Sequence, residues 1–155
     1  MEMPKPNEHH QQLARLAGAW KGEETLSHSP MGPGETTTST MTMRVDIDGL
    51  FLIQDYAQEK NGSVVYRGHG ILGWDDQQKN VAWYWVDSMG FVPSAPSRGT
   101  WDGDTITLEH PPMGDRRGRY IYALEDANTL TFAIENSQDG GKTWHRFLAG
   151  KYQRN

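Results

Sequence analysis

Apolar and polar residues alternate along most of this chain, and a period of two predicts β-strands. Leu130, Phe132 and Ile134 share one face of such a segment, while threonine and alanine fill the positions between them. Ile106 and Leu108 alternate with polar residues in the same way. One apolar and one polar face are typical of an antiparallel sheet that covers a core on one side only. The pattern therefore indicates a half-buried antiparallel sheet.

Turn-forming residues separate these segments at short intervals. Asn-Gly and Asp-Gly pairs supply the positive φ angles that tight hairpins need, and they occur at 48–49, 61–62, 102–103 and 139–140. About ten strands are predicted, near residues 18–26, 36–47, 50–59, 64–74, 80–87, 97–101, 104–110, 117–125, 129–136 and 143–153. Successive hairpins make a meander, and closing it removes the exposed sheet edges. We predict an all-β fold, a closed or nearly closed antiparallel meander barrel of about ten strands.

The N-terminal segment differs from the rest of the chain. Residues 1–8 are polar with two prolines and are expected to form a flexible tail. The spacing of Leu13 and Leu16 predicts one short amphipathic helix from Glu8 to Leu16, ended by Gly18. Residues 9–155 are expected to form a single barrel domain.

Composition changes the expected nature of the core. Aliphatic residues are scarce, and much of the apolar area is carried by 6 Trp, 6 Tyr and 7 Met. Aromatic rings bury roughly 150–250 Å² each, so a few of them replace many valines. We therefore expect an aromatic-rich interior.

Charge and cysteine content exclude several classes of partner. A formal net charge of −5 argues against nucleic-acid binding, which needs a basic surface. No apolar run is long enough to span a membrane. The chain has no cysteine and no secretory pattern at its N-terminus, which favours a cytoplasmic location.

Two neighbouring predicted strands carry the most suggestive chemistry. Arg67 and His69 share one face of the strand at 64–74, and Trp83, Trp85 and Asp87 share a face of the next strand. If both sets face the same interior, His69 lies beside Trp85 and Asp87, a polar group among aromatic walls as in many ligand pockets. A buried His–Asp hydrogen bond that only fixes the core explains the same residues equally well.

Other motifs point to structure or remain open. The segment 137–144, SQDGGKTW, has the form of an Asp-box, in which Asp139 accepts backbone N–H bonds across a hairpin while Trp144 packs beneath it. The histidines show no metal-binding spacing, so no metal site is expected. The apolar, proline-containing connection 88–97 is either a loop packed over the barrel rim or a functional lid or mouth loop.

The chain resembles an uncharacterised bacterial family, DUF1579. The matching segments are Asp48-Gly49-Leu50-Phe51-Leu52, Tyr66-Arg67-Gly68-His69-Gly70, Trp85-Val86-Asp87-Ser88-Met89-Gly90 and Trp101-Asp102-Gly103-Asp104. A short helix followed by Gly18-x-Trp20 also resembles the opening of lipocalins and other calycins, in which this Trp closes one end of the barrel. The resemblance implies a lipocalin-like barrel and no particular activity. A more distant resemblance to nitrobindin-type barrels implies haem as an alternative ligand. The sequence does not assign His69, His110 or His145 to the strand that would carry the axial ligand of the haem.

The leading hypothesis is a barrel that binds a small hydrophobic or amphipathic molecule without chemistry and without a cofactor. The expected cavity or rim residues are Trp20, Glu24, Met43, His69, Trp85, Asp87, Met89 and Arg119. A second hypothesis is an enzyme, a hydrolase or isomerase that uses His69 with Asp87 or Glu24, and a position of His69 on the outer face would argue against it. A third is a homodimeric structural or interaction module. It would assemble through the strands 80–87 and 117–125, which are apolar on both faces.

Overall fold

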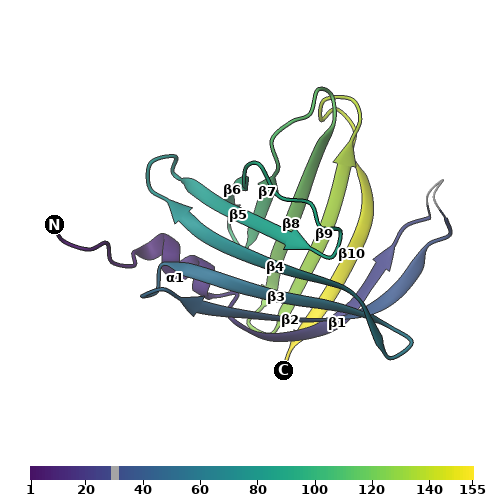
Figure 1. Cartoon of the computed structure of the whole chain (residues 1–155), viewed down its shortest axis with the longest axis horizontal. Coiled ribbons are helices and arrows are strands. Elements are labelled where there is room, and N and C mark those ends of the chain that lie inside the picture. Colours follow the sequence, from purple (N-terminus) through teal and green to yellow (C-terminus); the bar gives the residue numbers. More distant parts are fainter. Residues whose placement is uncertain (29–31) are drawn as a thin grey trace.

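Ten strands form the wall of the protein in the computed structural model, which describes residues 1–28 and 32–155 (Figure 1). They are β1 (Gly18–Leu26), β2 (Glu35–Asp46), β3 (Phe51–Lys60), β4 (Ser63–Asp75), β5 (Asn80–Asp87), β6 (Ser97–Asp102), β7 (Thr105–Glu109), β8 (Arg117–Asp126), β9 (Thr129–Ser137) and β10 (His145–Arg154). Each pairs antiparallel with the next, and β1 pairs with β10 to close the barrel. The predicted closed meander is confirmed.

The hairpin turns follow the predicted turn chemistry. Asn61 and Gly62, between β3 and β4, have φ angles of 53° and 79°. Two successive positive φ angles twist the turn to match the right-handed twist of the flanking strands. Asp48 and Gly49, between β2 and β3, also have positive φ angles, of 57° and 85°. Local sequence therefore determines where the strands reverse direction.

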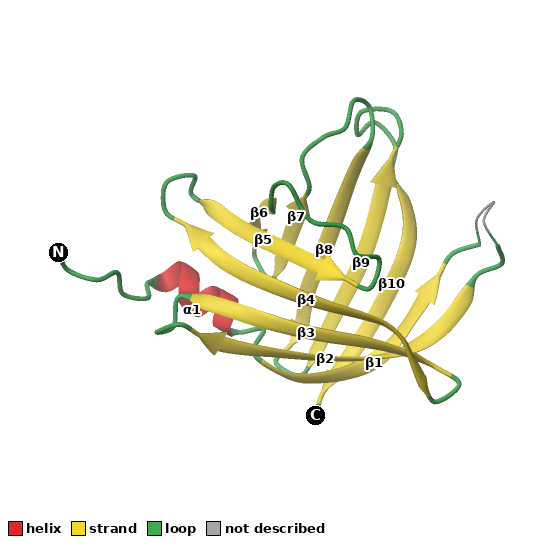
Figure 2. Cartoon of the chain, in the orientation of Figure 1, coloured by secondary structure: helices red, strands yellow, loops and turns green. Residues whose placement is uncertain are grey.

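One short helix, α1 (Glu8–Ala14), lies beside one end of the barrel (Figure 2). Asn7 caps it by accepting the backbone N–H of His9 at 2.9 Å. Leu13 and Leu16 are buried in the core, and the indole N–H of Trp20 donates to the carbonyl of Leu16 at 3.0 Å. These side chains fill the end of the barrel next to α1. Within the described part of the chain, no helix has the length and apolarity needed to cross a membrane.

Glycines on the inner face of β4 make room for the tryptophans of β5. Gly68 pairs with Asp87, and Gly70 pairs with Trp85, so these residues point to the same side of the sheet. A Cβ atom at Gly70 would lie 2.6 Å from the indole nitrogen of Trp83, and one at Gly68 would overlap the Trp85 ring. The glycine face of β4 is therefore the interior face.

The outer face of β5 is not covered by the rest of the described chain. Tyr84 is 48% exposed and Val86 is 45% exposed. The apolar pattern on both faces of this strand therefore reflects core on one side and open surface on the other.

Candidate functional site

The barrel is hollow at the end away from α1. A cavity of about 340 Å³ lies there, within the range of roughly 300–1,000 Å³ that is usual for small-molecule sites. Its wall comprises Glu24, Leu26, Met41, Tyr56, Gln58, Tyr66, Trp83, Trp85, Asp87, Tyr120, Tyr122, Phe132, Ile134, Asn136, Phe147, Leu148 and Tyr152. Nine of these residues are aromatic, so a ligand inside would contact mainly ring faces and edges.

A buried carboxyl group, that of Glu24, is at the centre of a hydrogen-bond network in this wall. Glu24 is only 1% exposed. Its Oε2 accepts the hydroxyl of Tyr56 at 2.6 Å and the amide of Gln58 at 3.1 Å, and its Oε1 accepts the hydroxyl of Tyr152. Burial, and then the nearby negative charge of Glu24, raise the pKa of Tyr56 and of Tyr152 well above the ordinary value. Both phenols are therefore protonated donors at neutral pH.

A second carboxyl group, that of Asp87, lies at the last residue of β5. Its Oδ2 accepts the Tyr66 hydroxyl at 2.6 Å and the Trp85 indole N–H at 2.8 Å. Its Oδ1 accepts the backbone N–H of Met89 at 2.9 Å. Partial burial alone would raise the pKa of Asp87, but these hydrogen bonds outweigh it and the pKa lies below its ordinary value. Asp87 is therefore ionised at neutral pH and held in one orientation.

The aromatic side chains of the cavity wall pack against each other. The ring centroids of Trp83 and Trp85 are 5.3 Å apart, and Trp83 meets Tyr120 edge-on at 4.9 Å. Tyr122 stacks on Phe132 at 4.5 Å. Such contacts restrict ring motion, so the cavity has a preformed shape.

A buried amide fixes the deeper rings. Gln54 is fully buried, and its amide donates to the hydroxyl of Tyr122 at 2.8 Å. Its carbonyl oxygen accepts the Trp83 indole N–H at 3.2 Å. Buried polar groups that are hydrogen-bonded specify a single arrangement of the core, and here they orient two rings of the cavity wall.

Three of the residues expected to line the cavity do so, namely Glu24, Trp85 and Asp87. Trp20 and Met43 are also inside the barrel, at 1% and 2% exposure, but they belong to the packed core and not to the cavity wall. Trp20 is held next to Leu16, whose carbonyl accepts its indole N–H, at the end of the barrel beside α1.

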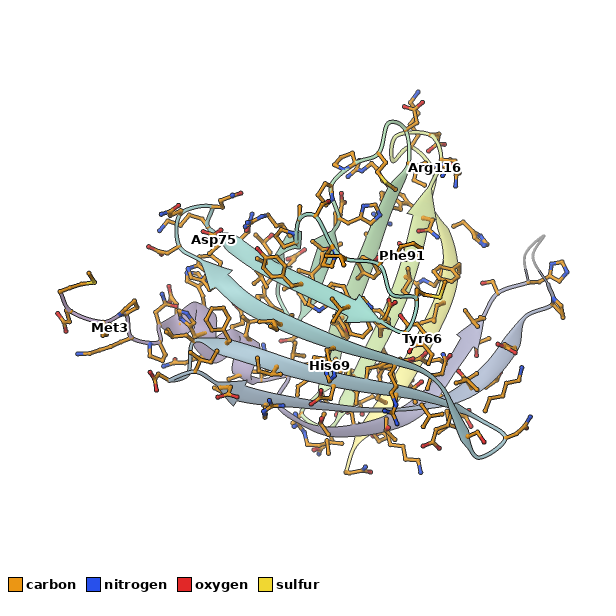
Figure 3. All side chains as sticks on the ribbon, viewed as in Figure 1. Met3, Tyr66, His69, Asp75, Phe91 and Arg116 are labelled. Atoms are coloured by element: carbon orange, nitrogen blue, oxygen red, sulfur yellow. The ribbon has the colours of Figure 1, made fainter. Side chains whose placement is uncertain are left out.

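Two further candidates lie outside the cavity. Met89 is 66% exposed in the connection between β5 and β6, and only its backbone reaches Asp87. Phe91 of the same connection, labelled in Figure 3, is 77% exposed, so its ring is not packed on the rim. Arg119 is on the outer face of β8, where it pairs with Glu135 at 2.7 Å and covers the Trp144 ring at 3.8 Å.

The expectation that His69 shares the interior with Trp85 and Asp87 is wrong. His69 is on the outer face of β4, with 72% of its side chain exposed, and it contacts Asp55 of β3 (Figure 3). The physical reason is the pairing of Gly70 with Trp85, which turns the glycines inward and the residues between them outward. An acid–base pair of His69 with Asp87 or Glu24 is therefore not formed.

The histidines that the structure describes lie outside the cavity wall. The wall contains no histidine, and no cluster of three or more His, Asp or Glu side chains suited to a metal occurs among residues 1–28 and 32–155. His145 is exposed, and the ring of His110 contacts the carbonyl of Pro111. The ring of His110 also lies over the inward-facing position of Gly118, where a Cβ atom would be 2.7 Å from its Nε2, but His110 does not line the described cavity.

The wall residues that sequence reasoning missed include the four whose side chains donate to Glu24 or Asp87, namely Tyr56, Gln58, Tyr66 and Tyr152. The available signal was alternation: in β3, Tyr56 and Gln58 have the same parity as the apolar Leu52, so they share its inward face. Polar atoms on an otherwise apolar face indicate either a buried network or a pocket.

The Asp-box at residues 137–144 has a structural role on the hairpin between β9 and β10. Asp139 accepts the backbone N–H of Thr143 at 2.9 Å, and Ser137 accepts that of Gly141, also at 2.9 Å. The Trp144 indole N–H donates to the carbonyl of Gly141 at 3.1 Å. The motif therefore stabilises the hairpin turn between β9 and β10, as the sequence predicts.

Solved structures share this barrel. The crystal structure of Rv2717c from M. tuberculosis matches with a TM-score of 0.68 and 18% identity, over 96% of this chain and 98% of that chain. The S-type phycobiliprotein lyase CPES from Guillardia theta matches with a TM-score of 0.65 and 12% identity, over 97% of this chain and 98% of that one. At these identities the likeness is one of fold.

Sequence comparison gives the family. No curated protein matches the chain. A family model described as "Protein of unknown function (DUF1579)" matches residues 5–154, nearly the whole length. Together with the closed ten-strand barrel, this match shows that the chain belongs to the DUF1579 family.

Proposed function

We propose that the protein binds a small amphipathic molecule inside the barrel and releases it unchanged. The observation that carries this proposal is the cavity of about 340 Å³ with its aromatic wall and its two carboxyl groups. A cavity of ~150 Å³ accepts a benzene ring, so this one has room for a ligand of about two rings. The likeness to the lyase is one of fold alone, so the proposal rests on the cavity.

The hydrogen bonds of the wall favour binding over catalysis. Both carboxyl groups already accept three hydrogen bonds each from neutral donors, which hold them in place. The raised pKa of Tyr56, caused first by burial, makes its phenol a poor proton donor in a reaction. Groups fixed in this way recognise a ligand by position, and preorganisation of this kind favours affinity.

Filling the cavity tests the proposal. Ile134 lines the cavity on β9, and Ile71 is 44% exposed on the outer face of β4. Replacing Ile134 with Trp should block the cavity, whereas Ile71→Trp makes the same chemical change outside the barrel. The probe is prodan, a neutral naphthalene fluorophore whose emission shifts to the blue when it is buried.

The expected result is saturable one-to-one binding of prodan to the wild type and to Ile71→Trp. Ile134→Trp should lose at least about tenfold in affinity, about 1.4 kcal/mol, while retaining a folded circular dichroism spectrum. Equal binding to both variants would show that prodan does not enter the cavity. Native mass spectrometry of the purified wild type would, in addition, weigh any molecule that the protein retains.

A further inference from the structure

We infer that the preferred ligand carries a positive charge, such as an ammonium group, and that Glu24 is its counter-ion. This inference rests on the proposed function, because it assigns a chemical class to the occupant of the same cavity. The starting observation is a fully buried carboxyl group in the wall, Glu24, with a second one, Asp87, at the end of β5.

Neither carboxyl group has a cationic partner within the described chain. The groups that donate to Glu24 are two phenols and one amide, all neutral. Those that donate to Asp87 are a phenol, an indole and a backbone N–H. The described wall contains no lysine, arginine or histidine. Removing a carboxylate from water is costly unless a positive charge compensates it.

The outer wall of the same barrel shows how this chain otherwise treats a buried carboxylate. Glu135 is 8% exposed, and it is flanked by Arg119 at 2.7 Å and Arg146 at 3.0 Å. Two guanidinium groups thus compensate Glu135, whereas none compensates Glu24. The difference indicates that the counter-charge of Glu24 comes from the occupant of the cavity.

The rest of the cavity suits a cation and disfavours an anion. Tryptophan and tyrosine faces attract cations through the negative potential of their π-systems, and nine rings line the space. Oε1 of Glu24 accepts one hydrogen bond, from Tyr152, and a carboxylate oxygen can accept about two. It therefore retains capacity for an N–H donor. A carboxylate or phosphate in the same place would face two negative charges.

Three naphthalene compounds of nearly equal size test the inference. They are 1-naphthylmethylamine, which is a cation at neutral pH, 1-naphthalenemethanol, which is neutral, and 1-naphthoate, which is an anion. Their affinities are measured by competition with prodan on the wild type, on Glu24→Gln and on Glu135→Gln. Glu24→Gln keeps the side-chain shape without the charge, and Glu135→Gln makes the same change on the outer wall.

The expected result is that the wild type binds the amine at least about tenfold more tightly than the alcohol, and the naphthoate least of all. Glu24→Gln should abolish the preference for the amine while still binding the alcohol, and Glu135→Gln should keep the preference. In the absence of ligand, Glu24→Gln should retain the folded circular dichroism spectrum of the wild type. Glu135→Gln should be less stable, because two ion pairs are weakened.

Two outcomes would overturn the inference. Equal affinity of the wild type for amine and alcohol would do so while leaving the proposed function intact, since prodan would still bind. An amine preference that survives in Glu24→Gln would do so as well. Failure of prodan to respond to the filling of the cavity by Ile134→Trp would instead refute the proposed function.

Discussion

Replacement of Gly68 by Ala should destabilise the barrel and push Trp85 into the cavity. The added methyl carbon would have three ring atoms of Trp85 within 2.8 Å, whereas carbon atoms in contact prefer about 3.5–4.0 Å. The ring must therefore move, and Trp83 and Tyr56, with centroids 5.3 and 6.0 Å away, limit where it can go.

The magnitude follows from two effects. Overpacking a core costs roughly 1–3 kcal/mol. Displacing the indole also weakens its 2.8 Å hydrogen bond to Asp87, and hydrogen bonds to charged groups contribute roughly 1.5–3 kcal/mol. Replacing glycine with alanine also reduces the conformational entropy of the unfolded chain, which stabilises the folded state by about 0.4–1 kcal/mol. We expect a net decrease of about 2–4 kcal/mol in the free energy of unfolding, or a decrease in Tm on the order of 10 °C.

Gly73→Ala is the matched control on the same strand. A Cβ atom there would meet the ring of Phe51 at 2.7 Å, but Phe51 is 38% exposed and can swing toward solvent. Because both variants gain the same methyl group, the difference between their urea unfolding curves isolates the effect of Trp85. Near-ultraviolet circular dichroism should also change in Gly68→Ala alone. If the two variants unfold at the same urea concentration, Trp85 is not held against β4 as described.

Two more predictions concern hydrogen bonds. Tyr152→Phe removes a donor to the buried Glu24 and should lower the free energy of unfolding by about 1–3 kcal/mol. The control Tyr84→Phe, on the exposed outer face, should change that free energy by less than about 0.5 kcal/mol. Equal urea midpoints for the two variants would contradict this prediction. The hydroxyl and then the backbone N–H of Thr143 lower the pKa of Asp139 to about 2 from 3.8. The stabilisation of this turn is thus complete above pH 3.8 and lost as the pH falls toward 2. The Thr143 amide should therefore exchange faster with solvent as the pH decreases through this range, relative to the intrinsic rate. In Asp139→Asn that additional pH dependence should disappear, and its persistence would exclude Asp139 as the cause.

The meander was predictable because each hairpin has its own local chemistry. Asn61 and Gly62 adopt positive φ without regard to distant residues, and alternation in β9 is visible from its own residues. The observed strand limits lie within one or two residues of the expected ones.

The cavity was only partly predictable, because alternation groups residues by face without stating which face is inward. In β4 the inward face carries glycines and the outward face carries His69. The chemistry of these residues alone favours an inward histidine. The decisive information is the pairing of Gly68 and Gly70 with residues of β5, a non-local property. The partners of Glu24 come from β3 and β10, which lie on opposite sides of β1 in the closed sheet and are distant from it in sequence, so no local pattern could connect them.

The packed end of the barrel has a kinetic consequence. Leu13, Leu16 and Trp20 fill that end, so a molecule in the cavity has to leave by the route through which it entered. A competing ligand cannot enter from the packed end and displace the bound molecule. Exchange of one ligand for another should therefore be dissociative, with a release rate that is independent of competitor concentration. In kinetic terms, the bound ligand has to dissociate before the next ligand can bind.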